Sequence, residues 1–191
     1  MLRSQERNTE KRALLSQKYN DIFLVFDFEP HHDNPHFDTV RRMLKYFNCS
    51  SERGKLYLNY PMIQSYKHIM RLPDRMFSYK TINIEDVYKY KEIVGKESSF
   101  QDLSKYTYAT FVSLAVHHIK KANYLITGED ILPPVEIYLD MNSLDIFDEE
   151  YSLLMKQRVV SILNTSLFIF VDFKPRAFFR EITSNNARFD I

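Results

Sequence analysis

The most constraining feature of the sequence is a short apolar segment, Asp21-Ile-Phe-Leu-Val-Phe-Asp27, which lies between two polar stretches. Its five central residues are apolar at odd and even positions alike. Successive side chains of a strand point to opposite faces of a sheet, so this pattern is typical of a strand covered on both faces, as in a parallel sheet. The segment therefore predicts a central strand of an α/β fold.

A helix and a second strand follow at the spacing of a β-α-β unit. Apolar residues at 37, 40, 44 and 47 recur at helical intervals. Gly54 ends that stretch, residues 55–59 predict the second strand, and Pro61 predicts the start of another helix. A crossover of this length makes the two strands parallel, so both end at the same edge of the sheet. That edge carries Asp27, Glu29, Asn59 and Tyr60.

The rest of the chain has a mainly helical pattern. Periodicity predicts helices over residues 3–19, 84–94, 101–124 and 145–157. Residues 159–164 predict a third strand, and residues 167–171 are compatible with a short helix or a short strand.

The expected organisation is a single domain, because no linker rich in Pro, Gly or Ser divides the chain. We expect one domain over residues 1–191, with a sheet core in 1–70, a mainly helical part in 71–158, and a returning strand with the C-terminal segment in 159–191. The expected fold class is α/β, with a short, mainly parallel, Rossmann-like sheet and a large helical portion.

Composition excludes several classes of protein. The three glycines stand alone, so the Gly-rich loops that bind the phosphates of ATP or NAD are absent. Cys49 is the only cysteine, which excludes an intramolecular disulfide and fits a reducing cytoplasm. The net charge is +1, so no overall basicity draws the chain to nucleic acid or membrane. The longest apolar runs have five residues, whereas a membrane span needs about 20, so we expect a soluble, cytoplasmic protein with no membrane partner.

Acidic side chains gather after the first predicted strand. Asp27 and Glu29 are two residues apart, so an extended backbone turns both side chains to the same face. Asp33 follows in the next loop, beside His31 and His32. Mg²⁺ and Mn²⁺ favour carboxylate ligands, and α/β proteins place their sites at the carboxyl edge of a parallel sheet. We predict a Mg²⁺ or Mn²⁺ site formed by Asp27, Glu29 and Asp33; the alternative is that these acids only solvate the turn.

The region around this acidic pair resembles a known family. Tyr19-Asn-Asp-Ile-Phe-Leu-Val-Phe-Asp-Phe-Glu29, a helix, and Gly54-Lys-Leu-Tyr-Leu-Asn-Tyr-Pro-Met-Ile-Gln-Ser-Tyr-Lys-His68 together resemble the RloB-like branch of the Toprim superfamily, over about 50 of 191 residues. In that branch a strand ending in Asp-x-Asp precedes a helix, a strand and an Asn-Pro-x-x-Glu helix start with a nearby His. The resemblance implies a Toprim-type Rossmann-like sheet, a divalent metal, and cleavage or rejoining of nucleic-acid phosphodiesters, commonly in bacterial phage defence.

The resemblance also implies roles for individual residues. It matches Asp27 and Glu29 to the catalytic, metal-binding acids, and Asn59, Gln64 and His68 to substrate-binding positions. Glu29 stands where relatives have a second Asp, and Gln64 stands where they have a Glu. The family's upstream strand with its Glu has no counterpart in the polar residues before the first strand. Either the chain begins late relative to the family, or the domain has kept the fold and lost the chemistry.

A rival hypothesis is a non-enzymatic module that binds a partner protein. Residues 128–151 contain eight acids and no Lys or Arg, which suits a solvated helix face or a docking surface for a basic partner over residues 129–150. The many Tyr and Phe residues interleave with lysines, which fits either a core and its rim or a surface that stacks single-stranded nucleic acid. A nuclease would gather Asp27, Glu29 and a third carboxylate around one ion, whereas a binding module would use Asp27 as a cap or in an ion pair.

Overall fold

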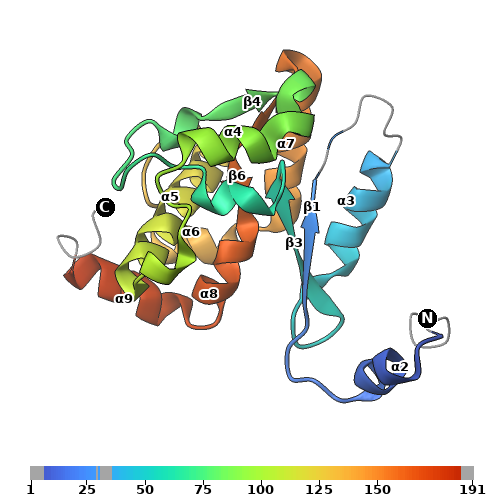
Figure 1. The fold of residues 1–191 in the computed structure, drawn as a ribbon. Helices are drawn as coiled ribbons and strands as arrows, with labels where there is room; N and C mark the ends of the chain where they lie inside the picture. The colour runs from blue at the N-terminus through green and yellow to red at the C-terminus, as the bar shows by residue number, and fades with distance from the viewer. Residues whose placement is uncertain (1–6, 29, 31–35, 186–191) are drawn as a thin grey trace.

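The computed structural model describes residues 7–28, 30 and 36–185 of the 191-residue chain (Figure 1). Helices make up most of it, and the strands are short. In chain order, with 3-10 helices labelled η, the elements are α2 Thr9–Ser16, β1 Phe23–Asp27, α3 Phe37–Tyr46, β2 Asn48–Cys49, β3 Gly54–Tyr60, η1 Ile63–Lys67, η2 Phe77–Tyr79, β4 Thr81–Asn83, η3 Ile84–Lys89, α4 Tyr90–Glu97, η4 Leu103–Lys105, α5 Tyr108–Thr127, α6 Val135–Asp140, α7 Ser143–Gln157, β5 Val159–Ser161, β6 Leu163–Asn164, η5 Thr165–Leu167, α8 Phe168–Asp172 and α9 Pro175–Ser184.

The main sheet has mixed strand directions. Its order is β1-β3-β2, and β6 pairs with the end of β3. β1 and β3 are parallel, in a register that sets Asp27 opposite Asn59, whereas β2 and β6 run antiparallel to β3. β4 and β5 form a separate antiparallel pair. The mixed α/β class and the parallel pairing of the first two predicted strands are confirmed, but a mainly parallel, Rossmann-like sheet is not.

β1 is an edge strand with largely exposed side chains, so the prediction of a central, doubly covered strand is wrong. Val25 is 44% exposed and Phe26 is 48% exposed, whereas β3 is buried along almost its whole length. An apolar sequence pattern shows which side chains gain free energy from burial. It does not determine how many strands and helices pack against them. Among the described residues, only β3 pairs with β1.

The segment after β3 forms a 3-10 helix in place of the predicted α-helix. η1 covers Ile63–Lys67, and His68 follows it as the C-terminal cap. Each residue of a 3-10 helix turns the chain by about 120°, so residues four apart do not lie on one face as they do in an α-helix. Gln64 and His68 therefore do not form the one-faced pair expected from an α-helical spacing.

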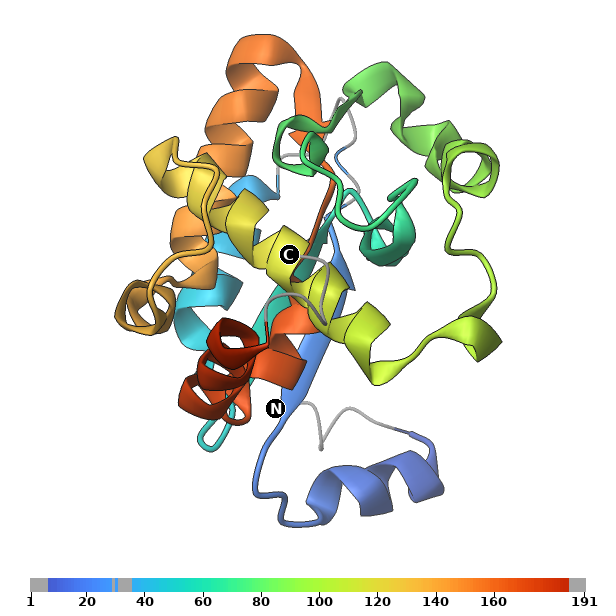
Figure 2. The same cartoon turned by 90° about the vertical axis from the view of Figure 1, so that its left-hand side faces the viewer.

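The long helix α5 lies at the centre of the helical portion (Figure 2). It contacts η2, α7, β6, η5 and α8. Thr107 and Thr110 form a capping box at its start, and Gly128 ends it with a φ of 79°, a left-handed conformation that glycine adopts without strain. The predicted helices near 101–124 and 145–157 are thus present as α5 and α7, with shifted boundaries.

One hydrophobic core links the sheet to the helices, with buried members from Phe28 to Ile182. Its largest fully buried side chains include Tyr57, Tyr60, Tyr90 and Phe147. Within the described ranges, no helix combines the length and the apolar character needed to cross a membrane.

Candidate functional site

The shared end of β1 and β3 places Asp27 beside Asn59. The two residues are partners in the parallel register, and the Phe28 N–H donates to the Asn59 carbonyl oxygen at 2.9 Å. In-register neighbours project to the same face of a sheet, so both side chains leave the same face. Asp27 is exposed and Asn59 is fully buried. The β-α-β pattern thus correctly predicted that these two residues end neighbouring strands.

Asn59 belongs to a buried polar cluster that ties β3 to the segments around it. Its Oδ1 accepts a hydrogen bond from the Ser166 N–H at 3.1 Å, and Asn164 lies opposite it on β6. Asn164 donates from its backbone N–H to His118 Nδ1 at 2.9 Å and from its Nδ2 to the Ile63 carbonyl oxygen at 2.8 Å. The end of β3 beside Asp27 is therefore joined by hydrogen bonds to α5, β6 and η1.

Several buried polar atoms of this region lack a hydrogen-bond partner among the described residues. They include Nδ2 of Asn59, Oε1 of Gln64 and Oγ of Ser65. Gln64 and Ser65 are joined to the cluster through the neighbouring Ile63 carbonyl, which Asn164 binds. Buried polar groups are almost always paired with protein or water, so each of these unpaired atoms indicates a place where water or a polar ligand can bind.

His68 is buried and uses both ring nitrogens within the protein. Nδ1 lies 3.0 Å from the Tyr90 hydroxyl, and Nε2 lies 2.9 Å from Glu97 Oε2. Burial lowers the pKa of His68, so the neutral ring accepts from Tyr90 and donates to Glu97. The His68 bond and Lys80, 3.2 Å away, hold the pKa of Glu97 below its usual value. His68 thus joins η1 to α4 and has both nitrogens engaged.

The other predicted metal ligands lie outside the described residues. These are Glu29 and Asp33, together with His31 and His32 in the same loop. Within the ranges that the structure does describe, no group of three or more His, Cys, Asp or Glu residues is arranged to hold a metal ion.

The acidic segment 129–150 is engaged within the chain only in part. Asp130 accepts from the Ser78 hydroxyl, Asp148 pairs with Arg41 at 2.7 Å, and Glu150 is buried. Six of its eight acids are exposed, so both the solvated face and the docking surface stay predictions.

A second polar cluster, which the sequence did not predict, surrounds Asp172. Its Oδ2 accepts from the Tyr57 hydroxyl at 2.7 Å and pairs with Lys55, and its Oδ1 accepts from the Tyr138 hydroxyl at 2.6 Å. Burial, reinforced by the Asp172 charge, raises the pKa of Tyr57 and Tyr138, so both phenols stay protonated. A cavity of about 390 Å³ lies beside the cluster, and its lining also includes Asp21 and Phe23.

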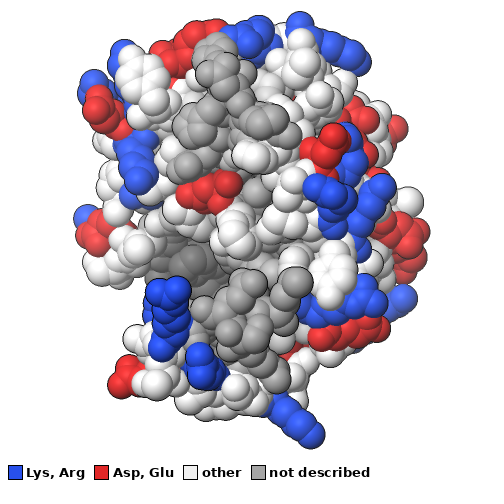
Figure 3. Space-filling model, turned by 90° about the vertical axis from the view of Figure 1, so that its right-hand side faces the viewer, with Lys and Arg blue, Asp and Glu red and all other residues white. Residues whose placement is uncertain are grey.

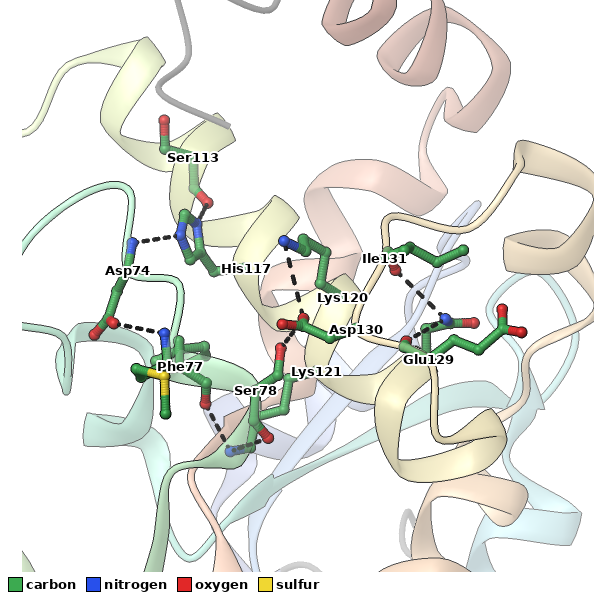
Figure 4. A network of polar contacts seen from close by, with 12 residues as sticks. Asp74, Phe77, Ser78, Ser113, His117, Lys120, Lys121, Glu129, Asp130 and Ile131 are labelled. Carbon is green, nitrogen blue, oxygen red and sulfur yellow. Dashed lines mark hydrogen bonds and ion pairs between the residues drawn. The ribbon is translucent and has the colours of Figure 1, made fainter.

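A buried lysine forms a third polar cluster, shown in Figure 4. Lys121 of α5 is fully buried, and its Nζ donates to the carbonyl oxygens of Phe77 (3.0 Å), Ser78 (3.3 Å) and Lys80. Burial lowers its pKa to about 7. Lys121 lies three residues after the core residue His118, so helical spacing was the one sequence signal that could have predicted its burial.

We expect the free energy of unfolding to fall as the pH drops below about 6.5, because three histidines are held neutral. Burial is the largest cause of a lowered pKa for His68, His117 and His118. The unfolded chain takes up protons near pH 6.5 and the folded chain resists them, so stability present above that pH is lost below it. Each such histidine adds a slope of up to about 1.4 kcal/mol per pH unit. Urea unfolding between pH 8 and pH 5 measures this slope.

One histidine variant makes this test specific. His117→Gln should flatten the pH dependence, because His117 is one of the three buried histidines. Equal slopes in the wild-type protein and His117→Gln would show that His117 titrates normally in the folded state.

Comparison with known proteins adds no relative from which a role could be transferred. The resemblance to the Toprim superfamily accordingly stays a prediction, and the chemistry of the site rests on the chain's own residues. No family model matches the sequence, and no curated protein and no solved structure is significantly similar to it.

Proposed function

We propose that the protein binds Mg²⁺ or Mn²⁺ at the β1/β3 edge and acts on a nucleic-acid phosphodiester there, as a Toprim-like protein of the RloB-like branch. The observation that carries the proposal is the position of the exposed Asp27 in register with Asn59, at the shared carboxyl end of two parallel strands. Ligand sites of α/β proteins lie at this kind of edge.

The donor and acceptor atoms at the edge fit a cation and a phosphate. Asp27 would supply a carboxylate, and Glu29 and Asp33 are the expected further ligands. When bound, the cation would polarise a phosphate and lower the pKa of a coordinated water. The unpaired Nδ2 of Asn59 is a donor of the kind that phosphate oxygens accept, and Oε1 of Gln64 is an acceptor for a coordinated water. His68 would position η1, since both its nitrogens are engaged.

The surface charge fits contacts with nucleic acid at a local site better than attraction by a broad basic surface. On the face seen in Figure 3, Lys and Arg are interspersed with Asp and Glu. The whole chain has a net charge of +1. A substrate would therefore be selected by the geometry of the edge, with weak nonspecific attraction.

The test compares the wild-type protein with Asp27→Asn for stabilisation by Mn²⁺ and for cleavage of nucleic acid. Millimolar Mn²⁺ should stabilise the wild-type protein, by about 1.4 kcal/mol at ten times the dissociation constant, because only the folded chain forms the site. Asp27→Asn should lose this shift, and it should lower cleavage of labelled single-stranded or duplex substrates by about 100-fold or more. Thermal melting and a gel assay with Mn²⁺ measure the two effects.

Asp140→Asn is the matched control, because Asp140 is an exposed aspartate on α6. It should keep both the Mn²⁺ shift and the cleavage. An equal shift in the wild-type protein and Asp27→Asn, or no shift in either, would remove the metal site from this edge.

A second candidate function is the non-enzymatic interaction module, favoured by the exposed apolar side chains of β1. A missing Mn²⁺ shift together with no cleavage products at enzyme excess would favour this candidate. Its surface would be the aromatic strand β1, whose apolar side chains are exposed, or the exposed acids of segment 129–150.

A further inference from the structure

The N-terminal arm, residues 7–20, lies apart from the rest of the molecule (Figures 1 and 2). Every side chain described in it is exposed, including Leu14 (55%) and Tyr19 (49%). Its helix α2 has only eight residues and has local bonds: the Lys11 N–H donates to Asn8 Oδ1, and the Tyr19 hydroxyl donates to the Leu14 carbonyl oxygen. An isolated helix of this length is unstable in water, so the arm needs a surface on which to pack.

The next segment of the chain exposes the complementary surface. Ile22, Phe23, Val25 and Phe26 are each between 37% and 48% exposed. The Lys55 N–H donates to the Ile22 carbonyl at 2.9 Å, so even-numbered residues of β1 bond to β3, and the backbone groups of Phe23 and Val25 face away from β3. An exposed, apolar edge strand is a surface that proteins cover.

The charges of the two regions are also complementary. The arm carries four basic residues, Arg7, Lys11, Arg12 and Lys18, and one acidic residue, Glu10. The cavity at the start of β1 has two carboxylates, Asp21 and Asp172, and one ammonium group, Lys55. Lys55 pairs with Asp172, so Asp21 is the carboxylate that favours a basic segment beside the apolar strand.

The arm is poorly placed to cover its own strand. In Figure 1, α2 lies beyond the start of β1, away from the strand. A second copy of the chain has the same arm and the same exposed strand. In a twofold-symmetric dimer, the arm of each copy can therefore cover β1 of the other.

We propose that two copies of this chain form a symmetric dimer by exchanging arms. The arm of each copy lies across β1 of the other, with Leu14 and Tyr19 against Phe23 and Val25. The basic residues of the arm lie near Asp21 of the second copy. This inference is independent of the metal chemistry proposed for the opposite end of β1.

The first test is the molar mass in solution, measured by light scattering after size exclusion. The wild-type protein should have the mass of a dimer, and Val25→Glu should have the mass of a monomer, because a charge would be buried in the new contact. Met155→Glu is the matched control, since Met155 is an exposed apolar residue on α7, and it should stay dimeric. A monomeric wild-type protein, or a Val25→Glu variant that stays dimeric, would overturn the proposal.

Disulfide trapping tests the exchange itself. Cys49→Ser removes the only cysteine, so Leu14→Cys and Val25→Cys can be placed in separate chains of that background. Mixing the two single-cysteine proteins under mild oxidation should give covalent dimers joined through residues 14 and 25. Absence of this crosslink in the mixture, with an intrachain disulfide in the doubly substituted chain, would show that the arm folds onto its own strand and would overturn the proposal.

Discussion

Replacing Lys121 with methionine is expected to lower the free energy of unfolding by about 3 kcal/mol at pH 7, since each buried hydrogen-bonding group left unpaired costs about 1–3 kcal/mol. The ammonium group is fully buried and donates to three backbone carbonyls, which would lose their donor. Glu150 is also fully buried, and the Lys121 charge is one of the interactions that favour its ionised form. Urea unfolding monitored by circular dichroism measures the loss.

The pH dependence distinguishes this pair from a simple packing defect. Burial raises the pKa of Glu150 from 4.5 to about 7, so its contribution to stability is present at low pH and is lost as the pH rises through 7. Burial lowers the pKa of Lys121 from 10.5 to about 7, so the unfolded chain binds more protons between pH 7 and pH 10.5, and stability rises over that window. Lys121→Met should abolish the rise between pH 7 and pH 10.5, because it removes the group that titrates there.

Lys120→Met is the matched control for Lys121→Met. Lys120 is the neighbouring residue of α5, and its Nζ lies 3.9 Å from Asp130 in a partly exposed pair. Such a pair contributes at most about 1 kcal/mol. If Lys121→Met cost no more than Lys120→Met, the buried ammonium would not stabilise the fold. Glu150→Gln combined with Lys121→Met should cost less than the sum of the two single changes, because the residues interact.

The sequence predicted the elements whose formation depends on local pattern. The apolar stripe of α5 and the glycine after it indicated the long helix, and residues 145–157 indicated α7. The spacing of strand, helix and strand also placed Asp27 and Asn59 on neighbouring strands. Periodicity and crossover length act within about 40 residues, which is why these predictions succeeded.

The predictions that failed depended on what the rest of the chain supplies. β1 has the composition of a buried strand, but β3 alone pairs with it in the described structure. Residues 159–164 were predicted as one strand, yet β5 pairs with β4 and β6 pairs with β3. In both cases the residues form strands as predicted, and contacts with the rest of the chain determine which strands they pair with.

The Asp172 cluster could not be predicted, because its members come from distant parts of the chain. Lys55 and Tyr57 belong to β3, Tyr138 to α6, and Asp172 to α8. Lys55, Tyr57 and Asn59 alternate along β3 and so share one face of the strand. The carboxylate that accepts the Tyr57 hydrogen bond lies more than 100 residues away, so no local sequence pattern indicates it.

Asp172→Ala is expected to destabilise the protein by about 2–4 kcal/mol, because it leaves two buried phenols without their acceptor. The Tyr57 and Tyr138 hydroxyls both donate to this carboxylate, and burial keeps both in the protonated, donating form. The loss would also weaken the link between α8, β3 and α6, since the carboxylate bonds to side chains of both other elements. Equilibrium urea unfolding at pH 7 measures the change.

Double variants show whether the lost hydrogen bonds cause this effect. In the background of Tyr57→Phe, which has no donor to leave unpaired at residue 57, Asp172→Ala should cost about 1 kcal/mol less than in the wild-type protein. Asp140→Ala, at an exposed aspartate of α6, should change stability by less than about 0.5 kcal/mol. An equal cost of Asp172→Ala in both backgrounds would show that the Tyr57 bond contributes nothing, and the carboxylate would then stabilise the fold only through Lys55 and Tyr138.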